Sequence, residues 1–389
     1  MLKKLISKKQ LSVIGVNTGT SCDGLDIALI RFTPSGKRPY VEFIEGRTLP
    51  FPNKIKQPLE RLITSDSKNG KTIARHDIAL GTFIGESVRD FARKTKHKID
   101  LIASHGQTIG HYPDKQNILG NKTAATLQIG DGNAIACAAN MPVVSDFRKA
   151  DIALGGEGAP LTPFCNHLLF AHKKHSRLIV NIGGIANYTF LPGSNDSGHI
   201  EGADCGPGNT LIDNAMRTLF NKPCDTDGTI ASTGKIIPAV VKEIMKAAGK
   251  TKSTGREIYT PELLARIVYL ARREKAGKND IIASITEATV DGICRAIGKH
   301  AKSKPDGVYL TGGGRRNLYI VRRLTEKLKP LVIWPIEALG FDGDLLEAVS
   351  FAVLGGCYIH GIPSTLPNVT GAAVGGIAGK LSLPKKNVK

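Results

Sequence analysis

The feature that most constrains the fold is a segment near the start of the chain, residues 13–32, in which two apolar runs flank a polar turn. The segment reads VIGVNTGTSCDGLDIALIRF. It predicts a β-hairpin that can hold phosphate, because glycine lets the backbone approach an anion and the hydroxyl groups donate to phosphoryl oxygens. Asp23 and Asp26 could position a magnesium-bound triphosphate. Ordinary hairpin turns use the same residue types, so the segment alone leaves both interpretations open.

Two later segments repeat this design. Residues 177–191, RLIVNIGGIANYTFL, form a β-branched run that meets Gly183 and Gly184 and then resumes. Residues 308–317, VYLTGGGRRN, place three glycines between a strand and the expected start of a helix. Two strand–glycine–strand units suggest two related lobes. The order suggests phosphate, phosphate and then nucleoside as the groups that these turns bind.

This arrangement resembles the ATP-binding folds of actin, hexokinase and Hsp70, whose duplicated domains each contribute a glycine hairpin to a cleft. The fold expected from the resemblance is α/β, a two-lobed actin/hexokinase-like ATPase fold with duplicated mixed-sheet domains and a central cleft. We expect a first lobe over residues 1–140, joined by a returning segment at 343–389, and a second lobe over 141–342. Helices are expected over residues 72–96 and 344–358, where apolar residues recur at helical spacing.

A longer series of motifs resembles one family, the anhydro-N-acetylmuramic acid kinases. The matching segments follow the family's order along nearly the whole chain: GTSxDGxD at 19–26, SHGQT at 104–108, TLQIGD at 126–131, VVxDFRxxDIAxGGxGAPL at 143–161, NIGGIAN at 181–187, GxDxGPGN at 202–209, KSTGRE at 252–257, the GGG turn at 312–314, EAxxFA at 347–352 and LPNVTGA at 366–372. The chain departs from the family at Asn17, Thr18, Ala203 and Cys205, where Met, Ser, Phe and Thr are expected.

The resemblance implies ATP with nucleotide-bound Mg²⁺ as the cofactor. We expect no structural metal held by the protein, because the cysteines lack the two-residue spacing of a zinc or redox motif. Matching the glycine turns to the family's motifs predicts these ATP-binding residues: Gly19, Thr20, Ser21, Cys22, Asp23, Gly24, Leu25, Asp26, Gly183, Gly184, Gly312, Gly313 and Gly314.

The implied reaction opens the 1,6-anhydro ring of 1,6-anhydro-N-acetylmuramic acid and phosphorylates O6, for recycling of cell-wall sugar. Oxygen 6 is tied to carbon 1 in this substrate, so a base must activate water to attack carbon 1 while oxygen 6 takes the γ-phosphoryl group. Asp204, in EGADCGPGN, matches the family's catalytic aspartate. By its sequence chemistry alone, it could equally be a turn residue that caps a helix beginning near Asn209.

Recognition of the sugar needs several polar groups and a cation for the lactyl carboxylate. Arg148 suits that carboxylate because its guanidinium is a planar fork. His105 is expected to orient the sugar by hydrogen bonding, since no metal-like spacing surrounds it. For each candidate, a role in a buried network that joins strand ends stays open. The predicted substrate-binding residues are His105, Gln107, Gln128, Asp131, Arg148 and Asp151.

Two alternative functions stay open at this level. One is a kinase for another 1,6-anhydro sugar, such as levoglucosan. The other is a non-catalytic nucleotide switch like actin or Hsp70, which would bind ATP without a sugar.

Two other nucleotide-binding motifs are incomplete in this sequence. Segments 70–72 and 249–251 read Gly-Lys-Thr, but the earlier glycine that a Walker loop requires is replaced by Ser65 and Ile244. No GxGxxG opens a helix after a strand, so a dinucleotide enzyme is not supported.

Composition bounds the partners. The 389 residues are 41% hydrophobic, which is enough for two cores, and no apolar run approaches the roughly 18 residues of a membrane span. The net charge of +19 is spread in short groups along the chain and is not interleaved with aromatics, which argues against nucleic acid as a partner. We expect a cytoplasmic enzyme that binds an anhydro sugar and ATP, with no membrane partner. The family resemblance implies a homodimer.

Overall fold

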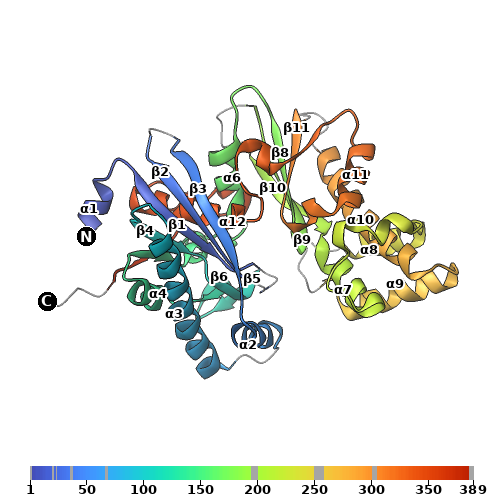
Figure 1. Cartoon of the computed structure of the whole chain (residues 1–389), viewed down its shortest axis with the longest axis horizontal. Helices are drawn as coiled ribbons and strands as arrows, with labels where there is room; N and C mark the ends of the chain where they lie inside the picture. Colours follow the sequence, from blue (N-terminus) through green and yellow to red (C-terminus); the bar gives the residue numbers. More distant parts are fainter. Residues whose placement is uncertain are drawn as a thin grey trace. The chain divides into compact units, whose positions relative to one another are not determined.

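The computed structural model describes residues 2–19, 22, 24–35, 38–65, 69–193, 200–248, 258–299 and 305–384. Its contacts divide the chain into two compact units (Figure 1). The first unit comprises Met1–Leu169 and Asp344–Lys389, and the second comprises Phe170–Gly343. Among the described residues, no helix combines the length and the apolar character that crossing a membrane requires.

The first unit is built on a mixed six-stranded sheet in the order β13-β7-β4-β1-β2-β3. Strand β1 pairs antiparallel with β2, and β2 pairs antiparallel with β3; on its other side β1 is parallel to β4, and β4 is parallel to β7. The strands are β1 (Leu11–Asn17), β2 (Gly24–Thr33), β3 (Tyr40–Pro50), β4 (Leu101–Ser104), β7 (Val143–Ser145) and β13 (Lys380–Ser382).

The sheet of the second unit has five strands in the order β10-β9-β8-β11-β12. Strand β8 pairs antiparallel with β9, β9 pairs antiparallel with β10, β8 is parallel to β11 and β11 is parallel to β12. This is the order and direction of β3-β2-β1-β4-β7 in the first unit. The predicted α/β class and the duplication of a mixed sheet are therefore confirmed. The strands are β8 (Arg177–Ile182), β9 (Ile185–Leu191), β10 (Glu201–Pro207), β11 (Gly307–Thr311) and β12 (Ile333–Pro335).

Helices of the first unit include the two that the sequence predicts. The helix expected over 72–96 begins two residues earlier, because the side chain of Asn69 accepts from the backbone N–H groups of Lys71 and Thr72. The helix expected over 344–358 is almost wholly buried, as its near-continuous apolar sequence requires. The helices are α1 (Leu2–Ile6), α2 (Asn53–Thr64), α3 (Gly70–Lys94), α4 (Gly132–Ala139), α5 (Phe147–Ala153), α6 (Thr162–Phe170), α12 (Leu346–Ile359) and α13 (Pro367–Thr370).

The first unit extends to Leu169, beyond the boundary at residue 140 that we expected. Strand β7 belongs to its sheet, because Val143 and Val144 pair with β4. Helix α6 also packs in this unit, where the thiol of Cys165 donates to the carbonyl of Ser350 at 3.4 Å. The segment 141–169 therefore shares a core with the first sheet rather than with the second.

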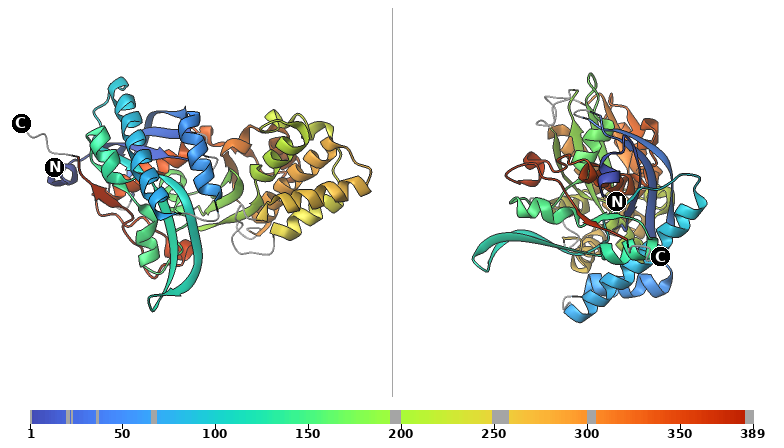
Figure 2. Two further views of the ribbon diagram at one scale, coloured as in Figure 1. Left: turned by 90° about the horizontal axis from the view of Figure 1, so that it is seen from below. Right: turned by 90° about the vertical axis from the view of Figure 1, so that its left-hand side faces the viewer.

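A two-stranded ribbon, β5 (Gln107–Ile118) and β6 (Asn121–Ile129), belongs to the first unit. Leu119 and Gly120 form its turn with φ angles of 52° and 81°. Figure 2 shows the ribbon curving away from the rest of that unit. The base of the ribbon joins Gln107 to Ile129, so two motifs of the sequence meet there.

The second unit packs helices around α10, whose buried residues include Ile282, Ile285 and Ile293. Short 3-10 turns connect several of its elements. The helical elements are α7 (Asn209–Phe220), η2 (Thr226–Gly228), η3 (Ala231–Thr233), α8 (Pro238–Ala248), α9 (Pro261–Arg273), α10 (Lys278–Lys299), η6 (Gly313–Arg316), α11 (Leu318–Lys327) and η7 (Ile336–Leu339).

Close packing of α12 on β1 leads to the first prediction. A Cβ atom at Gly15 would lie 1.8 Å from the carbonyl oxygen of Ala348, whereas one at Gly70 would meet nothing within 4 Å. We expect Gly15→Ala to lower the free energy of unfolding by about 3 kcal/mol or more, because backbone must move to admit the methyl group. Gly70→Ala is the control, with an expected change below about 1 kcal/mol. Thermal unfolding followed by circular dichroism measures both, and equal stability of the two variants would contradict this packing.

Candidate functional site

The first glycine hairpin lies between β1 and β2. Three of its predicted ATP-binding residues, Thr20, Ser21 and Asp23, lie outside the described residues. Cys22 has a φ of 53°, and its N–H donates to the carbonyl of Gly19 at 3.0 Å. The side chains of Cys22 and Leu25 are buried in the core of the first unit. Only the backbone of these two residues is therefore suited to meet a nucleotide.

At the start of β2, the other two described residues of this motif have identifiable contacts. A Cβ atom at Gly24 would lie 2.7 Å from the carbonyl oxygen of Leu49, so the approach of β2 to β3 requires glycine here. Asp26 accepts a hydrogen bond from the hydroxyl of Thr48 at 2.6 Å. Asp26 is half-buried and keeps part of its carboxylate at the surface.

The second glycine hairpin supports a helix start. Gly183 and Gly184 form the turn between β8 and β9, and their carbonyls accept from the first N–H groups of the α7 region. The N–H of Asn209 donates to Gly183 at 2.8 Å, and the N–H of Thr210 donates to Gly184 at 3.1 Å. A Cβ atom at Gly208 would lie 2.3 Å from the carbonyl oxygen of Gly183. The glycines therefore allow backbone to pack against backbone at this point.

The third glycine turn, which follows β11, also lies at the carboxyl end of β8. Strand β11 lies beside β8, and a Cβ atom at Gly312, whose φ is 76°, would lie 2.3 Å from the Oδ1 atom of Asn181. A Cβ atom at Gly314 would lie 2.2 Å from Ile182. The Asn209 amide donates to the carbonyl of Ile182 at 3.2 Å. The structure thus brings together all five nucleotide-binding glycines predicted in the second unit, at the carboxyl end of β8.

Asp204 lies inside β10, opposite Asn187 of β9, and a bulge follows between Asp204 and Gly206. A Cβ atom at Gly292 of α10 would lie 2.6 Å from the carbonyl oxygen of Cys205, so α10 packs directly on the bulge. Bulges of this kind re-aim side chains and are common at functional sites. The residue that caps α7 is Gly208, which places Asp204 four residues before the cap and within a strand.

Tyr259 interacts electrostatically with the Asp204 carboxylate. Its side chain is buried, and its hydroxyl has no hydrogen-bond partner within the part of the chain that the structure describes. Burial raises the pKa of Tyr259, and the negative charge of Asp204 raises it further. The carboxylate and the phenol therefore share one neighbourhood. Sequence reasoning missed Tyr259, because it follows the KSTGRE motif without belonging to it.

His105 and Arg148 form the centre of a polar cluster in the first unit. The Nε of Arg148 donates to His105 Nε2 at 3.0 Å, and its Nη1 donates to the carbonyl of Gly158 at 3.0 Å. The imidazole stacks on Phe351 with ring centroids 4.4 Å apart. Burial, and then the charge of Arg148, hold the pKa of His105 well below its usual value. The imidazole is therefore neutral at pH 7, with its proton on Nδ1, because Nε2 accepts.

Several buried polar atoms of this cluster lack partners among the described residues: His105 Nδ1, Gln107 Oε1 and Gln128 Oε1. The amide nitrogen of Gln128 donates to the hydroxyls of Thr126 at 2.8 Å and Thr108 at 3.2 Å, which fixes the direction of its oxygen. An unpaired buried donor or acceptor costs about 1–3 kcal/mol, so such groups call for a ligand or water. The structure thus groups three predicted sugar-binding residues as one donor and two acceptors.

The two predicted aspartates of the sugar site have contacts within the protein. Asp131 caps α4 by accepting from the N–H of Ala134 at 2.8 Å. Asp151 has no exposed surface, and it accepts from the N–H of Gly158 at 2.8 Å and from the hydroxyl of Thr370 at 2.6 Å. The carboxylate oxygens of Asp151 thus bond within the protein, in the kind of buried network that the sequence left open, and its contact with the sugar stays a prediction. For Asp131, contact with the sugar also stays a prediction.

Glu347 joins this cluster, although sequence reasoning assigned it no role. The amide of Asn17 donates to its Oε2 at 2.7 Å. Its side chain keeps contact with solvent, yet desolvation raises its pKa, opposed by the Asn17 hydrogen bond and the charge of Arg148. The signals that could have found it are the EAxxFA motif and the Asn17 that departs from the family. The ends of β1 and β4, with α5 and α12, therefore carry one linked set of polar groups.

The two units define an α/β protein with a duplicated mixed sheet and glycine turns at the sheet edges. A family model, Anhydro-N-acetylmuramic acid kinase, matches residues 11–382. Proteins with that name from Bacillus thuringiensis subsp. konkukian (strain 97-27) and Bacillus cereus (strain ATCC 10987 / NRS 248) are each 35% identical to the chain, and each comparison covers 96% of the chain and 99% of the relative. The chain belongs to the anhydro-N-acetylmuramic acid kinase family, as its motifs predict.

Solved structures show more distant likeness. The activator of the 2-hydroxyisocaproyl-CoA dehydratase from Clostridium difficile, with bound ADPNP, is 13% identical with a TM-score of 0.45, over 90% of this chain and 96% of that chain. The ROK hexokinase from Thermus thermophilus is 15% identical with a TM-score of 0.36, over 88% and 98%. Likeness at this level is too low to support an assignment, which depends instead on the matching sheets and the family match.

The neutral state of His105 gives a prediction on pH. Its pKa is about 6.5 in the unfolded chain and well below that value in the fold. The unfolded state therefore binds a proton first as pH falls through 6.5, and the folded state loses up to about 1.4 kcal/mol of stability per pH unit until the folded pKa is reached. We expect wild type to lose more stability than His105→Gln between about pH 7.5 and pH 5.5. Denaturant unfolding measures this difference, and parallel pH profiles would rule out a buried neutral imidazole.

Proposed function

We propose that this protein is an ATP-dependent kinase that hydrolyses the 1,6-anhydro ring of 1,6-anhydro-N-acetylmuramic acid and phosphorylates O6, giving N-acetylmuramic acid 6-phosphate and ADP. The observation that carries the proposal is the family match over residues 11–382, with relatives of that name at 35% identity. The glycine turns and the polar cluster supply the kinds of groups that this reaction needs.

Asp204 is the proposed base. Its carboxylate takes a proton from water as the water oxygen bonds to carbon 1, the bond from carbon 1 to O6 breaks, and O6 takes the γ-phosphoryl group as the bond to ADP breaks. The phosphoryl group accepts the charge that develops on O6, so a separate general acid for the leaving oxygen is unnecessary. The bulge after Asp204 and its partial burial favour a fixed carboxylate with an aqueous approach.

The glycines at the carboxyl end of β8 are the proposed nucleotide-binding groups of the second unit. Backbone free of side chains lets a polyphosphate or nucleoside approach closely. Mg²⁺ would neutralise charge on the transferring phosphoryl group, and it prefers carboxylate and water oxygens. Asp26, whose carboxylate is half-buried and bonded to Thr48, fits as a ligand of this ion or of its water. Asp23, the other candidate, lies outside the described residues.

The polar cluster of the first unit is the proposed sugar-binding group. His105 Nδ1–H offers a donor, and the amide oxygens of Gln107 and Gln128 offer acceptors, as the hydroxyl and acetamido groups of the substrate require. Arg148 uses Nε and Nη1 within the protein, and its Nη2 makes no hydrogen bond to any residue in the described ranges. Nη2 therefore suits the lactyl carboxylate, while the other two bonds hold the guanidinium in place.

We also propose a cytoplasmic homodimer, for which the family resemblance is the support. Size-exclusion chromatography with light scattering measures the assembly, and a monomer at micromolar concentration would contradict the dimer.

Replacing Asp204 tests the base. We expect Asp204→Asn to keep nucleotide affinity and to lower kcat by about 10²–10⁴, the usual contribution of a positioned base. Mass spectrometry should find a product that gains one water and one phosphoryl group, at a rate reduced by that factor. Glu201→Gln, on the same strand and exposed, is the matched control with expected normal turnover. Near-normal turnover of Asp204→Asn would remove Asp204 from this role.

Replacing Arg148 tests the substrate. We expect Arg148→Ala to raise KM for the muramic substrate by about 10-fold or more, since a charge-assisted hydrogen bond is lost. Activity on levoglucosan, which has no carboxylate, should change less, and Arg148→Lys should restore part of the affinity. Equal losses on both sugars would assign Arg148 to the support of His105 alone. Use of levoglucosan only would favour the other anhydro-sugar kinase, and ATP turnover without any phosphosugar would favour the nucleotide switch.

A further inference from the structure

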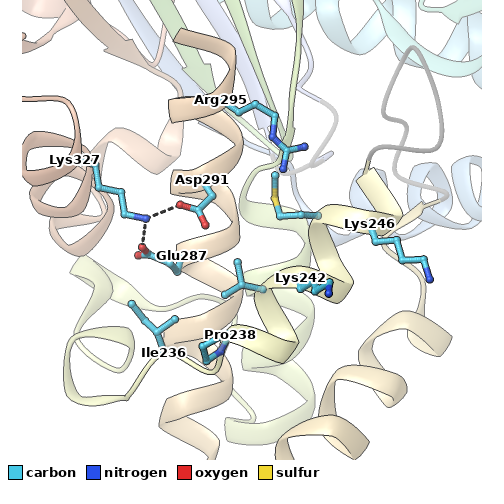
Figure 3. Close-up of a pocket in the computed structure, with 10 residues that line it drawn as sticks. Ile236, Pro238, Lys242, Lys246, Glu287, Asp291, Arg295 and Lys327 are labelled. Carbon is cyan, nitrogen blue, oxygen red and sulfur yellow. Dashed lines mark hydrogen bonds and ion pairs between the residues drawn. The ribbon is translucent and has the colours of Figure 1, made fainter. Parts of the chain in front are cut away.

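A cavity of about 610 Å³ lies within the second unit. Its lining comes from the segment before α8, one face of α8, the middle of α10 and the last residue of α11 (Figure 3). The lining residues are Ile236, Pro238, Val241, Lys242, Met245, Lys246, Glu287, Asp291, Arg295 and Lys327. The volume falls within the range of small-molecule sites.

Three cations of this lining have no carboxylate partner among the residues that the structure describes. Lys242 and Lys246 lie one helical turn apart on α8, and Arg295 lies across from them on α10. All three side chains are exposed, and none forms an ion pair with a residue that the structure describes. Like charges at this spacing on a helix repel one another. A bound anion would relieve this repulsion.

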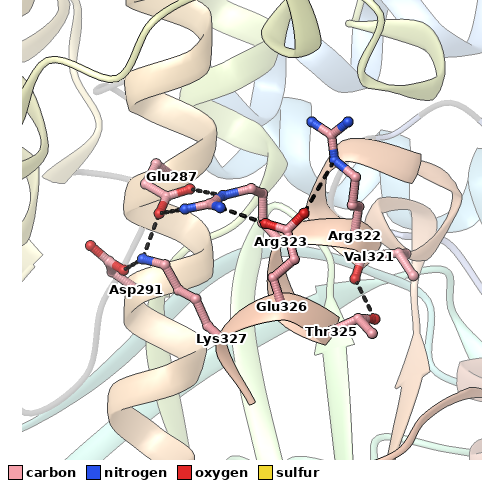
Figure 4. A network of polar contacts seen from close by, with 8 residues as sticks. All are labelled: Glu287, Asp291, Val321, Arg322, Arg323, Thr325, Glu326 and Lys327. Atoms are coloured by element: carbon pink, nitrogen blue, oxygen red, sulfur yellow. Dashed lines mark hydrogen bonds and ion pairs between the residues drawn. The ribbon is translucent and has the colours of Figure 1, made fainter. Parts of the chain in front are cut away.

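The acids of the lining are already neutralised. Lys327 Nζ lies 2.5 Å from both Glu287 Oε1 and Asp291 Oδ1, and Arg323 donates two hydrogen bonds to Glu287 at 3.0 and 2.8 Å (Figure 4). Burial works to raise the pKa of Glu287, but the bonds from Arg323 and Lys327 hold it below its usual value. The Glu287 carboxylate therefore remains charged. Both acids of the lining are paired with cations, so the remaining charge of the lining is positive.

The rest of the lining is apolar. Ile236, Pro238, Val241 and Met245 supply hydrocarbon surface beside the cations. Val241 and Met245 are themselves largely buried, so this surface is held by the core. A free inorganic anion would bind the cations but would leave the apolar side chains in contact with water. A compound with an anionic group attached to a ring would use both.

The cavity is separate from the glycine turns of the nucleotide site. Gly314 precedes α11, and Lys327 ends it. Ten helical residues at 1.5 Å each put about 15 Å between the two ends. Lys327 therefore lies a helix length away from the glycine turn, and none of the predicted nucleotide-binding glycines lines the cavity.

We propose that this cavity binds a small phosphorylated compound with a ring body, its phosphate against Lys242, Lys246 and Arg295 and its ring on Val241 and Met245. The site is additional to the proposed kinase reaction. Phosphate is favoured over a single carboxylate because a dianion matches three cations. A phosphosugar and a mononucleotide share this chemistry, and the two arms of the experiment distinguish them.

Calorimetric titration of the full chain tests the site, with Mg²⁺ and a non-hydrolysable ATP analogue present at saturation. Glucose 6-phosphate, adenosine 5′-monophosphate and inorganic phosphate are the probes. We expect one ring phosphate to bind once per chain and at least about 10-fold more tightly than inorganic phosphate, because the apolar surface contributes. The probe that binds more tightly identifies the source as phosphosugar or mononucleotide.

The variant Lys242→Ala/Lys246→Ala/Arg295→Ala should weaken this binding at least about 10-fold, since charge-assisted bonds are removed. The matched control is Lys54→Ala/Lys122→Ala/Arg272→Ala, which removes the same charge at exposed positions outside the cavity. The control should bind normally. Circular dichroism checks that both variants are folded.

Three results would overturn the proposal: no saturable binding of either ring phosphate, equal weakening in the control variant, or inorganic phosphate binding as tightly as the ring phosphates. The Asp204→Asn protein should bind normally, because Asp204 does not line the cavity. Since the titration needs no turnover, failure of the kinase proposal leaves its result intact.

Discussion

Backbone packed directly against backbone is the constraint on which both units depend. In the first unit, glycine at position 15 lets α12 lie on β1 with no side chain between them. That approach sets the start of α12 beside the end of β1, where Glu347 accepts from Asn17. A strand with any larger residue at position 15 would hold the helix away, and the polar cluster would lose its carboxylate.

The second unit also has glycines that let backbone pack directly against backbone, at the edge of its own sheet. Gly208 allows the start of α7 to contact the carbonyls of Gly183 and Gly184, and Gly312 allows the turn after β11 to reach Asn181. The first N–H groups of α7 are thereby satisfied by the hairpin itself. The glycine turns are thus part of the packing as well as candidates for contact with a nucleotide, which explains why the fold and the proposed site share the same residues.

Electrostatics in the two units follow from burial more than from net charge. The chain carries +19, yet the groups that matter for the proposed chemistry are set by local partners. His105 is neutral because it is buried beside Arg148. Glu287 is charged because Arg323 and Lys327 bond to it despite its burial. Lys242, Lys246 and Arg295 form no such pair within the described ranges, so the lining of the cavity keeps a positive charge.

Alternating apolar runs and glycine turns are local signals, so the sequence alone predicted the hairpins and the duplication. The ordered motifs indicated the family, and with it the candidates Asp204, His105 and Arg148. Tertiary structure alone decided which polar groups meet. Asp151 bonds to Thr370 across 219 positions, and Asn17 bonds to Glu347 across 330, so no local pattern could pair them. The unit boundary at Leu169 depends likewise on the pairing of β7 with β4. Such contacts arise only when distant segments share a core, since burial leaves each polar group to find a partner in space rather than along the chain.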